Sequence, residues 1–192
     1  MEKCISLLLI IFSIFFWGGN HGTVNANSND KPKPIEEFYP EFGGYTTAEE
    51  AIKEFEEHYN QDLKLPLRIP PITFTHYLGR FSDLDGDIND SLELTFISEE
   101  SPGNHYKIDV RPIEHKIQIP DKYIVKKVNL KNGNKAVYMK FSRGPYALVF
   151  ERDDWQYMFS IDKRASDKVN AEVLVKIANS IDYPSKKKSP FQ

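Results

Sequence analysis

The sequence predicts an α+β fold: an antiparallel β-meander with one face covered by an N-terminal and a C-terminal helix. Apolar residues recur at helical spacing over residues 46–60 and again over residues 170–183. Between these two segments, apolar and polar residues alternate with a period of two, as they do in half-buried strands. Short turn motifs separate the alternating runs, so neighbouring strands are expected to pair antiparallel as hairpins.

The first 26 residues predict a signal peptide rather than part of the fold. Lys3 precedes an apolar run of 16 residues from Cys4 to Gly19, and Val24 and Ala26 have a spacing that suits signal peptidase. An α-helix needs about 20 residues to span the hydrocarbon core of a membrane. We therefore expect cleavage after Ala26 and a secreted or extracytoplasmic domain. The alternative is an uncleaved helix that anchors the chain to the outer face of the cell membrane.

Composition limits the chemistry of the exported chain. Its single cysteine, Cys4, lies in the predicted signal peptide, so the domain has no disulfide, no thiolate metal site and no cysteine nucleophile. The formal net charge of −3 at pH 7 argues against a general nucleic-acid binder, which would carry a basic stripe. Packing alone is expected to stabilise the domain.

Polar segments flank a single predicted domain at residues 38–183. Residues 27–37 (NSNDKPKPIEE) combine polar side chains with spaced prolines, which is typical of a flexible linker. Residues 184–192 (PSKKKSPFQ) form a predicted flexible basic tail, whose three lysines predict at most a weak contact with a membrane surface or a wall polymer.

Each predicted helix has its own start signal. In TTAEEAIKEFEEHYN, Thr46 or Thr47 is the expected N-cap, and a glutamate three residues later completes a capping box. In NAEVLVKIANSIDYP, Asn170 is the expected N-cap and Pro184 prevents continuation. The apolar faces of the two helices consist of Ala48, Ala51, Ile52, Phe55 and Tyr59, and of Leu174, Ile177, Ala178 and Ile181.

The expected strands alternate apolar and polar side chains between turn signals. Asn132-Gly133 favours a type I′ turn between two of them. Trp155, Tyr157 and Phe159 share one face of the last strand, where aromatic residues at a period of two are typical of a core. The alternative is that this face and FYPEFGGY at 38–45 line a pocket for lipid or glycan. The expected strands are residues 72–81, 92–97, 106–110, 124–130, 135–141, 146–152 and 155–161.

Four aspartates crowd the segment SDLDGDIND at 82–90. An EF-hand loop needs glycine at position 6 and a bidentate glutamate at position 12. With Asp83 as position 1, these positions hold Ile88 and Leu94. We therefore interpret the segment as a surface turn between two strands, with a weak calcium site as the alternative. The acidic side chains of the segment are Asp83, Asp85, Asp87 and Asp90.

No motif predicts a metal site, a cofactor or a catalytic residue. His58, His76, His105 and His115 lack the spacing of a metal-binding pair on one helix or hairpin, and His58 extends the apolar face of the first helix. A zinc site assembled from distant residues is the alternative. The chain has no G-x-S-x-G elbow, no phosphate loop and no H-E-x-x-H sequence. The sequence therefore predicts that the protein is not an enzyme.

The order of the segments resembles that of the family called domain of unknown function 4367. DLKLPLRIPPITF at 62–74 is similar to the opening of that domain, and YALVFERDDWQYMFSI followed by AEVLVKIANSI is similar to its ending. Ala178, Ser180 and Ile181 occupy the small-residue-plus-isoleucine ending, and the similarity covers residues 63–181. The resemblance implies a curved sheet like that of periplasmic lipoprotein carriers, a place outside the membrane of a Gram-positive bacterium, and no recognised catalytic residues.

Together these features predict an exported binding or sensing domain without catalytic activity, whose partner is a protein or an apolar ligand. A lipid or lipoprotein carrier with an apolar cavity is the first alternative. The second alternative is a wall- or glycan-directed hydrolase, which requires two carboxylates that face each other across a cleft.

Overall fold

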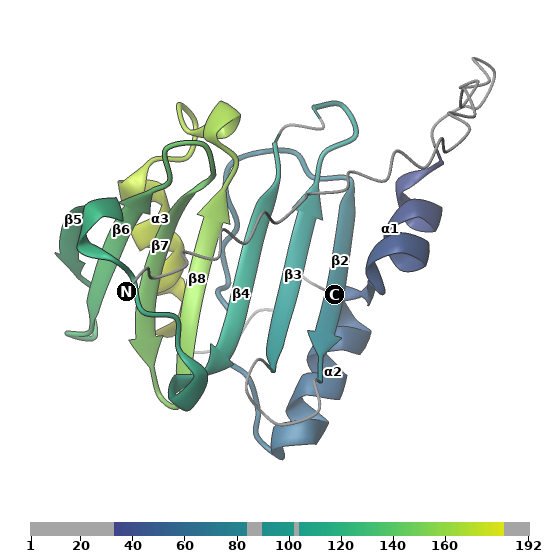
Figure 1. Cartoon of the computed structure of the whole chain (residues 1–192), viewed down its shortest axis with the longest axis horizontal. Coiled ribbons are helices and arrows are strands. Elements are labelled where there is room, and N and C mark those ends of the chain that lie inside the picture. The colour runs from purple at the N-terminus through teal and green to yellow at the C-terminus, as the bar shows by residue number, and fades with distance from the viewer. Residues whose placement is uncertain (1–32, 84–89, 102–103, 183–192) are drawn as a thin grey trace, which may run out of the picture. The chain divides into compact units, whose positions relative to one another are not determined.

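The structure, a computed structural model, describes residues 33–83, 90–101 and 104–182 (Figure 1). The predicted signal peptide at 1–26, residues 27–32 of the predicted linker and the predicted tail at 184–192 lie outside these ranges. Within the described ranges, no helix has the length and apolar character needed to cross a membrane. The helices are α1 (Ile35–Gly43), α2 (Ala48–Tyr59) and α3 (Ala171–Ala178). The strands are β1 (Thr46–Thr47), β2 (His76–Ser82), β3 (Ser91–Ile97), β4 (Tyr106–Pro112), β5 (Ile124–Asn129), β6 (Lys135–Lys140), β7 (Tyr146–Arg152) and β8 (Trp155–Ile161).

The strands form one eight-stranded antiparallel sheet with the order β1-β2-β3-β4-β8-β7-β6-β5, which confirms the α+β class. Two meanders, β2–β3–β4 and β5–β6–β7–β8, meet where β4 pairs with β8 (Figure 1). The prediction of a single meander is therefore wrong in its strand order, because the chain passes from β4 to the far edge of the sheet before β5. Alternation of apolar residues determines which face a strand buries, but it does not determine the neighbouring strand.

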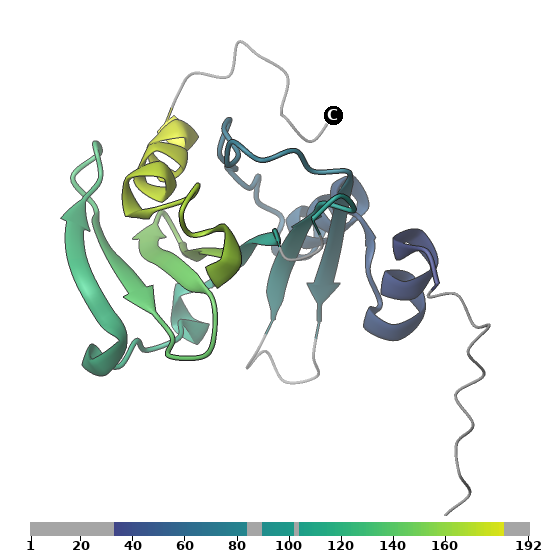
Figure 2. The ribbon, with the colours of Figure 1, turned by 90° about the horizontal axis from the view of Figure 1, so that it is seen from above.

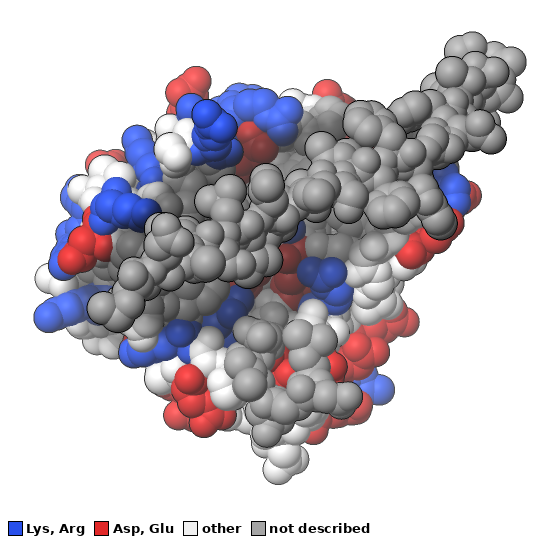
Figure 3. Space-filling model, viewed as in Figure 1, with Lys and Arg blue, Asp and Glu red and all other residues white. Residues whose placement is uncertain are grey.

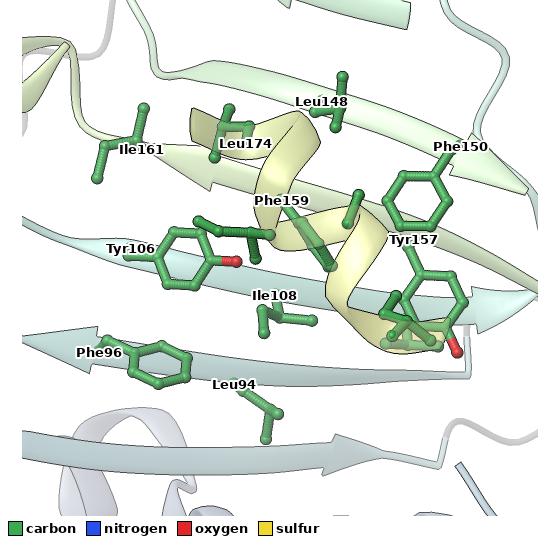
Figure 4. Packing of buried hydrophobic residues seen from close by; sticks show 14 of the residues in the cluster. Leu94, Phe96, Tyr106, Ile108, Leu148, Phe150, Tyr157, Phe159, Ile161 and Leu174 are labelled. Atoms are coloured by element: carbon green, nitrogen blue, oxygen red, sulfur yellow. The ribbon is translucent and has the colours of Figure 1, made fainter. Parts of the chain in front are cut away.

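The apolar core lies on one face of the sheet. Leu94, Ile108 and Phe159, from the three strands β3, β4 and β8, are fully buried in it (Figure 4). α2 and α3 lie on the same side of the strands (Figure 2) and add Phe55 and Leu174 to the same cluster. The core role predicted for the aromatic face of β8 is confirmed, because its alternate side chains are at most 3% exposed.

Both main helices start at their predicted caps. The Thr47 hydroxyl accepts a hydrogen bond from the Glu50 backbone N–H (3.2 Å), and the Glu50 carboxylate accepts one from the Thr47 backbone N–H (3.4 Å). Asn170 Oδ1 accepts hydrogen bonds from the backbone N–H groups of Glu172 (3.0 Å) and Val173 (3.1 Å). These caps satisfy N–H groups that have no partner within the helix, so the local sequence determines where α2 and α3 begin.

α1 begins at Ile35, inside the segment predicted to be a linker. The carbonyl of Pro34 accepts hydrogen bonds from the backbone N–H groups of Glu37 (3.1 Å) and Phe38 (2.9 Å). Gly44 ends the helix with a φ of 63°, a left-handed conformation that glycine adopts without strain. The spaced prolines suggested a linker, but proline is compatible with a helix start because the first N–H groups have no helical partner there.

The hairpin between β5 and β6 closes with a turn that differs from the predicted type I′. That turn needs a positive φ at both central residues. Gly133 has a φ of 88°, but the φ of Asn132 is not positive. The Gly133 N–H donates to the carbonyl of Leu130 (3.0 Å), and the Leu130 N–H donates to the carbonyl of Asn134 (2.8 Å). These bonds define a type I turn followed by a glycine bulge, which the same dipeptide also accommodates.

α2 approaches β2 closely because Gly79 has no side chain. A Cβ atom at Gly79 would lie 2.6 Å from the Cβ of Ala51 and 3.0 Å from the Cα of Ala48. We expect Gly79→Ala to lower the free energy of unfolding by about 1–3 kcal/mol, because α2 must move away from the sheet. Urea denaturation measures this loss, and Ser82→Ala on the same strand is the control. A loss no larger than that of the control would contradict the close approach of α2.

The other face of the sheet carries two kinds of side chain. Beside β6 and β7, a small apolar cluster forms around Met139, Ala147 and Val149. Ile119, from the connection between β4 and β5, packs against it. β2, β3 and β4 add the charged side chains of Arg80, Glu93, Lys107 and Asp109 to this face.

Candidate functional site

A basic pocket of about 590 Å³ lies where β4 begins, β8 ends and β6 turns into β7. The β4–β8 pairing sets Lys107 opposite Ser160, and the Asp162 N–H donates to the carbonyl of His105 (3.0 Å). The β6–β7 turn adds Arg143 from the neighbouring hairpin. The charged and titratable side chains that line the pocket are His105, Lys107, Arg143, Asp162, Lys163 and Arg164.

Positive charge exceeds negative charge in this basic pocket. Among the lining residues, Asp162 is the one acidic side chain, and the guanidinium of Arg164 already holds both of its carboxylate oxygens at 2.9 Å. Asp162 also accepts the Arg164 backbone N–H at 2.8 Å, so this pair is fixed locally. Arg143 and Lys163 are exposed and have no carboxylate partner in the part of the chain that the structure describes. Neither cation is neutralised by a described carboxylate, so both can contact an anionic ligand.

His105 adds a titratable group to the wall of the basic pocket. Burial lowers the pKa of its imidazole, Asp162 opposes this effect, and the cations Lys107 and Arg164 lower the pKa further. An anion bound beside the ring would favour its protonated form, because an opposite charge stabilises the charged state.

A second hollow, of about 490 Å³, continues the basic surface and shares Ser142 and Lys163 with the first. Its other cations lie over aromatic rings. Lys140 Nζ is 4.5 Å from the ring centroid of Tyr146, and Lys122 Nζ is 4.8 Å from that of Tyr123. Figure 3 shows lysine and arginine side chains gathered at this end of the sheet.

The sequence carries a signal for this surface that the net charge conceals. Residues 121–168 contain 11 Lys and Arg against 6 Asp and Glu, whereas residues 33–62 contain 9 Asp and Glu against 2 Lys. The positive excess of the first segment and the negative excess of the second nearly cancel, so the formal net charge of the whole chain is only −3. A count of charge by segment would have indicated a basic half, although not the pocket within it.

Lys107 joins the basic pocket to a hydrogen-bonded network on the open face of β3 and β4. The Lys107 ammonium lies 2.6 Å from Oε1 of Glu93, a carboxylate whose side chain is 16% exposed. The same oxygen accepts hydrogen bonds from the hydroxyls of Thr95 (3.0 Å) and Tyr45. The Arg80 guanidinium lies 3.8 Å from the other carboxylate oxygen. This network fixes the position of the Lys107 side chain at the floor of the pocket.

The carboxyl groups of Glu93 and Asp109 have pKa values that shift in opposite directions. Burial opposes ionisation of Glu93, but the hydrogen bonds from Lys107 and Tyr45 outweigh it and lower the pKa of Glu93. Asp109 lies directly opposite Glu93 in the β3–β4 register. Burial, with repulsion from the Glu93 charge, raises the pKa of Asp109 to about 6.

The histidines singled out in the sequence go to separate places. His76 Nε2 lies 2.7 Å from the Glu36 carboxylate, and His115 lies 3.7 Å from that of Glu114. His58 differs from these two because it contacts two carboxylates, those of Asp83 and Asp90 at the two ends of the aspartate segment. Asp85 and Asp87 lie outside the described residues.

The aromatic residues divide between core and surface. In the segment before α2, Phe38 is 48% exposed and Phe42 is 66% exposed, and their rings contact each other with centroids 5.0 Å apart. The aromatic side chains of β8 are buried instead. Neither group lines the basic pocket.

Comparison of the chain with protein-family models, with curated proteins and with solved structures finds no match. The resemblance of the sequence to domain of unknown function 4367 therefore stays a prediction, and the geometry of the site is what bears on the function.

Proposed function

We propose that the chain is an exported, non-catalytic binding domain whose ligand carries phosphate or carboxylate groups and is held in the basic pocket. The observation that carries this proposal is the pair Arg143 and Lys163, two exposed cations without a described carboxylate partner in one pocket. Guanidinium and ammonium groups bind such oxyanions through short, charge-assisted hydrogen bonds. The adjoining cations over the aromatic rings of Tyr123 and Tyr146 extend the surface toward a longer anionic ligand.

The location outside the cell is part of the proposal and rests on the predicted signal peptide. In that compartment, anionic wall polymers and anionic lipid headgroups present the chemistry that fits the pocket. The predicted basic tail adds three lysines that favour the same kind of partner.

The packing on the helix side supports a filled core rather than the cavity of a carrier. The rings of Phe150 and Tyr157 stack with centroids 5.2 Å apart, and Phe159 meets Phe150 edge-on at 5.2 Å. Tyr106 and Phe96 lie 5.1 Å apart in the same layer. Rings that pack against one another in this way would have to separate before an apolar ligand entered between them.

A charge-reversal experiment tests the anion site. We expect Arg143→Glu/Lys163→Glu to weaken binding of a short polyphosphate at least tenfold. Each substitution removes a cation whose hydrogen bond to the phosphate contributes about 1.5–3 kcal/mol to binding. Lys126→Glu/Lys127→Glu is the matched control, since it makes the same change in net charge on exposed residues of β5. Isothermal titration calorimetry at low and high salt measures both variants, and high salt is expected to weaken wild-type binding.

Equal losses in the two double variants would contradict the proposal, because they would show that only net charge matters. The same titration with isolated wall polymer and with vesicles containing anionic lipid distinguishes the two sources of the ligand. The proposal would also be overturned if the wild-type protein bound neither polyphosphate, nor wall polymer, nor vesicles containing anionic lipid.

A hydrolase acting on wall glycans is a second candidate, and one observation favours it. Glu93 and Asp109 face each other on paired strands with pKa values shifted apart, a pattern that acid–base pairs use. Against it, Lys107, Thr95 and Tyr45 all donate to one oxygen of Glu93, which is then poorly placed to attack a sugar. Incubation of the protein with isolated wall material and analysis of the released reducing ends decides between binding and cleavage.

A further inference from the structure

Three potential metal ligands from separate elements meet at the end of the β2–β3 hairpin. His58 Nε2 lies 3.5 Å from Oδ2 of Asp90, and His58 Nδ1 lies 3.8 Å from Oδ2 of Asp83. One donor atom from each of the three residues lies within 4.8 Å of the others. His58 comes from the last turn of α2, Asp83 follows β2, and Asp90 precedes β3.

The fold fixes two of these three groups. Asp90 is only 2% exposed, and the Ser82–Ser91 pair of the hairpin sets Asp83 and Asp90 on neighbouring chain ends. The ring of His58 packs between Tyr59 and Phe81, with centroids 4.7 and 5.1 Å away. Ligands whose orientation is set by packing lose little freedom when an ion binds. Asp83 is 63% exposed, so water and ions have access from its side.

The spacing fits a metal ion better than direct hydrogen bonds. Both nitrogen–oxygen distances exceed the 2.7–3.2 Å that is usual for such bonds, but they involve opposite nitrogens of the His58 ring, and one ion binds only one of them. Asp83 therefore reaches an ion shared by Nε2 and Asp90 through rotation of its exposed side chain. Two ligands at about 2.1 Å from a tetrahedral ion lie about 3.4 Å apart, which is close to the 3.5 Å between His58 Nε2 and Asp90 Oδ2. A cation here also lies near the C-terminal end of α2, where the helix dipole favours positive charge.

We propose that His58, Asp83 and Asp90 form a binding site for a first-row divalent metal ion of the Zn²⁺ type. An imidazole nitrogen with two carboxylate oxygens suits Zn²⁺ and its neighbours. Calcium, the ion that the aspartate-rich sequence suggests, takes six to eight oxygen ligands instead. With these three ligands from the described residues, the fourth position of a tetrahedral ion is open to water or to another group, as in open zinc sites.

The site ties α2 to the β2–β3 hairpin, so a bound ion stabilises the folded chain. His58 lies near the C-terminus of the helix, Asp83 directly follows β2, and Asp90 directly precedes β3. The ion binds the folded arrangement and not the unfolded chain, in which the three ligands are far apart. The site is separate from the basic pocket, with which it shares no residue.

Zn²⁺ titration of the untagged, chelator-treated protein tests the proposal. We expect 1:1 binding and a rise in Tm of roughly 5 °C or more at a Zn²⁺ concentration 100-fold above Kd. His58→Gln and Asp83→Asn are each expected to weaken Zn²⁺ binding roughly tenfold or more. His115→Gln, which removes a partly buried imidazole elsewhere, is the matched control and is expected to bind as the wild type does.

Asp83→Asn also guards against an unfolded variant, because its side chain is exposed and far-UV circular dichroism checks that the fold is kept. No 1:1 Zn²⁺ binding by the wild type would overturn the proposal, and so would unchanged binding in His58→Gln. An equal loss in His115→Gln, or tight Ca²⁺ binding without Zn²⁺ binding, would overturn it as well. An unchanged Tm in excess Zn²⁺ would show that His58 only contacts the two carboxylates, and it would overturn the proposal as well.

Discussion

Replacing Phe159 by alanine is expected to lower the free energy of unfolding by about 3–5 kcal/mol, the usual effect of removing a fully buried phenylalanine. Phe159 lies on β8 in the middle of the sheet and is 0% exposed (Figure 4). Its ring contacts those of Phe150, Tyr157 and Tyr106 with centroids 5.2, 6.2 and 6.3 Å away. Packed aromatic neighbours relax only partly into the space that the ring vacates, so the loss includes a cavity as well as lost burial.

Urea denaturation of Phe159→Ala beside Phe42→Ala measures the effect. Phe42 is 66% exposed, so its replacement is expected to change the free energy of unfolding by no more than about 1 kcal/mol. A loss below about 1 kcal/mol for Phe159→Ala would contradict a filled core on the helix side. That outcome would favour the carrier, because a ligand cavity tolerates the removal of one wall residue.

Asp109→Asn is expected to raise the free energy of unfolding by about 2–3 kcal/mol at pH 7.5 and to leave it nearly unchanged at pH 4. Burial and the Glu93 charge raise the pKa of Asp109 from 3.8 to about 6. Protonated Asp109 therefore stabilises the folded state below pH 3.8, and this contribution disappears as the pH rises through 6. Asparagine keeps the neutral, hydrogen-bonding form at every pH.

Urea denaturation at pH 4 and pH 7.5 measures the change, with Asp121→Asn as the control. Asp121 is an exposed aspartate in the short turn before β5, and its replacement is expected to change the free energy of unfolding by at most about 0.5 kcal/mol at both pH values. If Asp109→Asn destabilised the protein at pH 7.5, the carboxylate would be stabilised by its neighbours rather than strained by them. The cations that lower its pKa, Lys107, Arg111 and Arg80, would then outweigh its burial.

Local signals in the sequence succeeded where the structure depends on a few neighbouring residues. The caps at Thr47 and Asn170 and the alternation along β8 are examples, because a cap or a strand face is decided within one or two turns of chain. The linker prediction failed at Ile35 because the residues that end α1, such as Gly44, lie beyond the proline-rich segment.

Candidate sites depend on contacts between distant residues, which the sequence indicates only in part. The aspartate segment 82–90 is conspicuous in the sequence, but His58, which lies beside Asp83 and Asp90, comes 25 residues before Asp83 along the chain. The basic pocket joins β4 to the β6–β7 turn, which requires the pairing of β4 with β8. No spacing along the chain encodes that pairing, because β5, β6 and β7 intervene.

By itself, the sequence determined the α+β class, the starts of two helices, the aromatic core face of β8 and the chemistry that the lack of cysteine excludes. These properties follow from the side-chain period and from hydrogen bonds within a few residues. Only the tertiary structure decided the strand order, the basic pocket and the meeting of His58 with two aspartates. Each of these depends on which surfaces pack together across the whole chain, and burial of the core on one face of the sheet sets that arrangement.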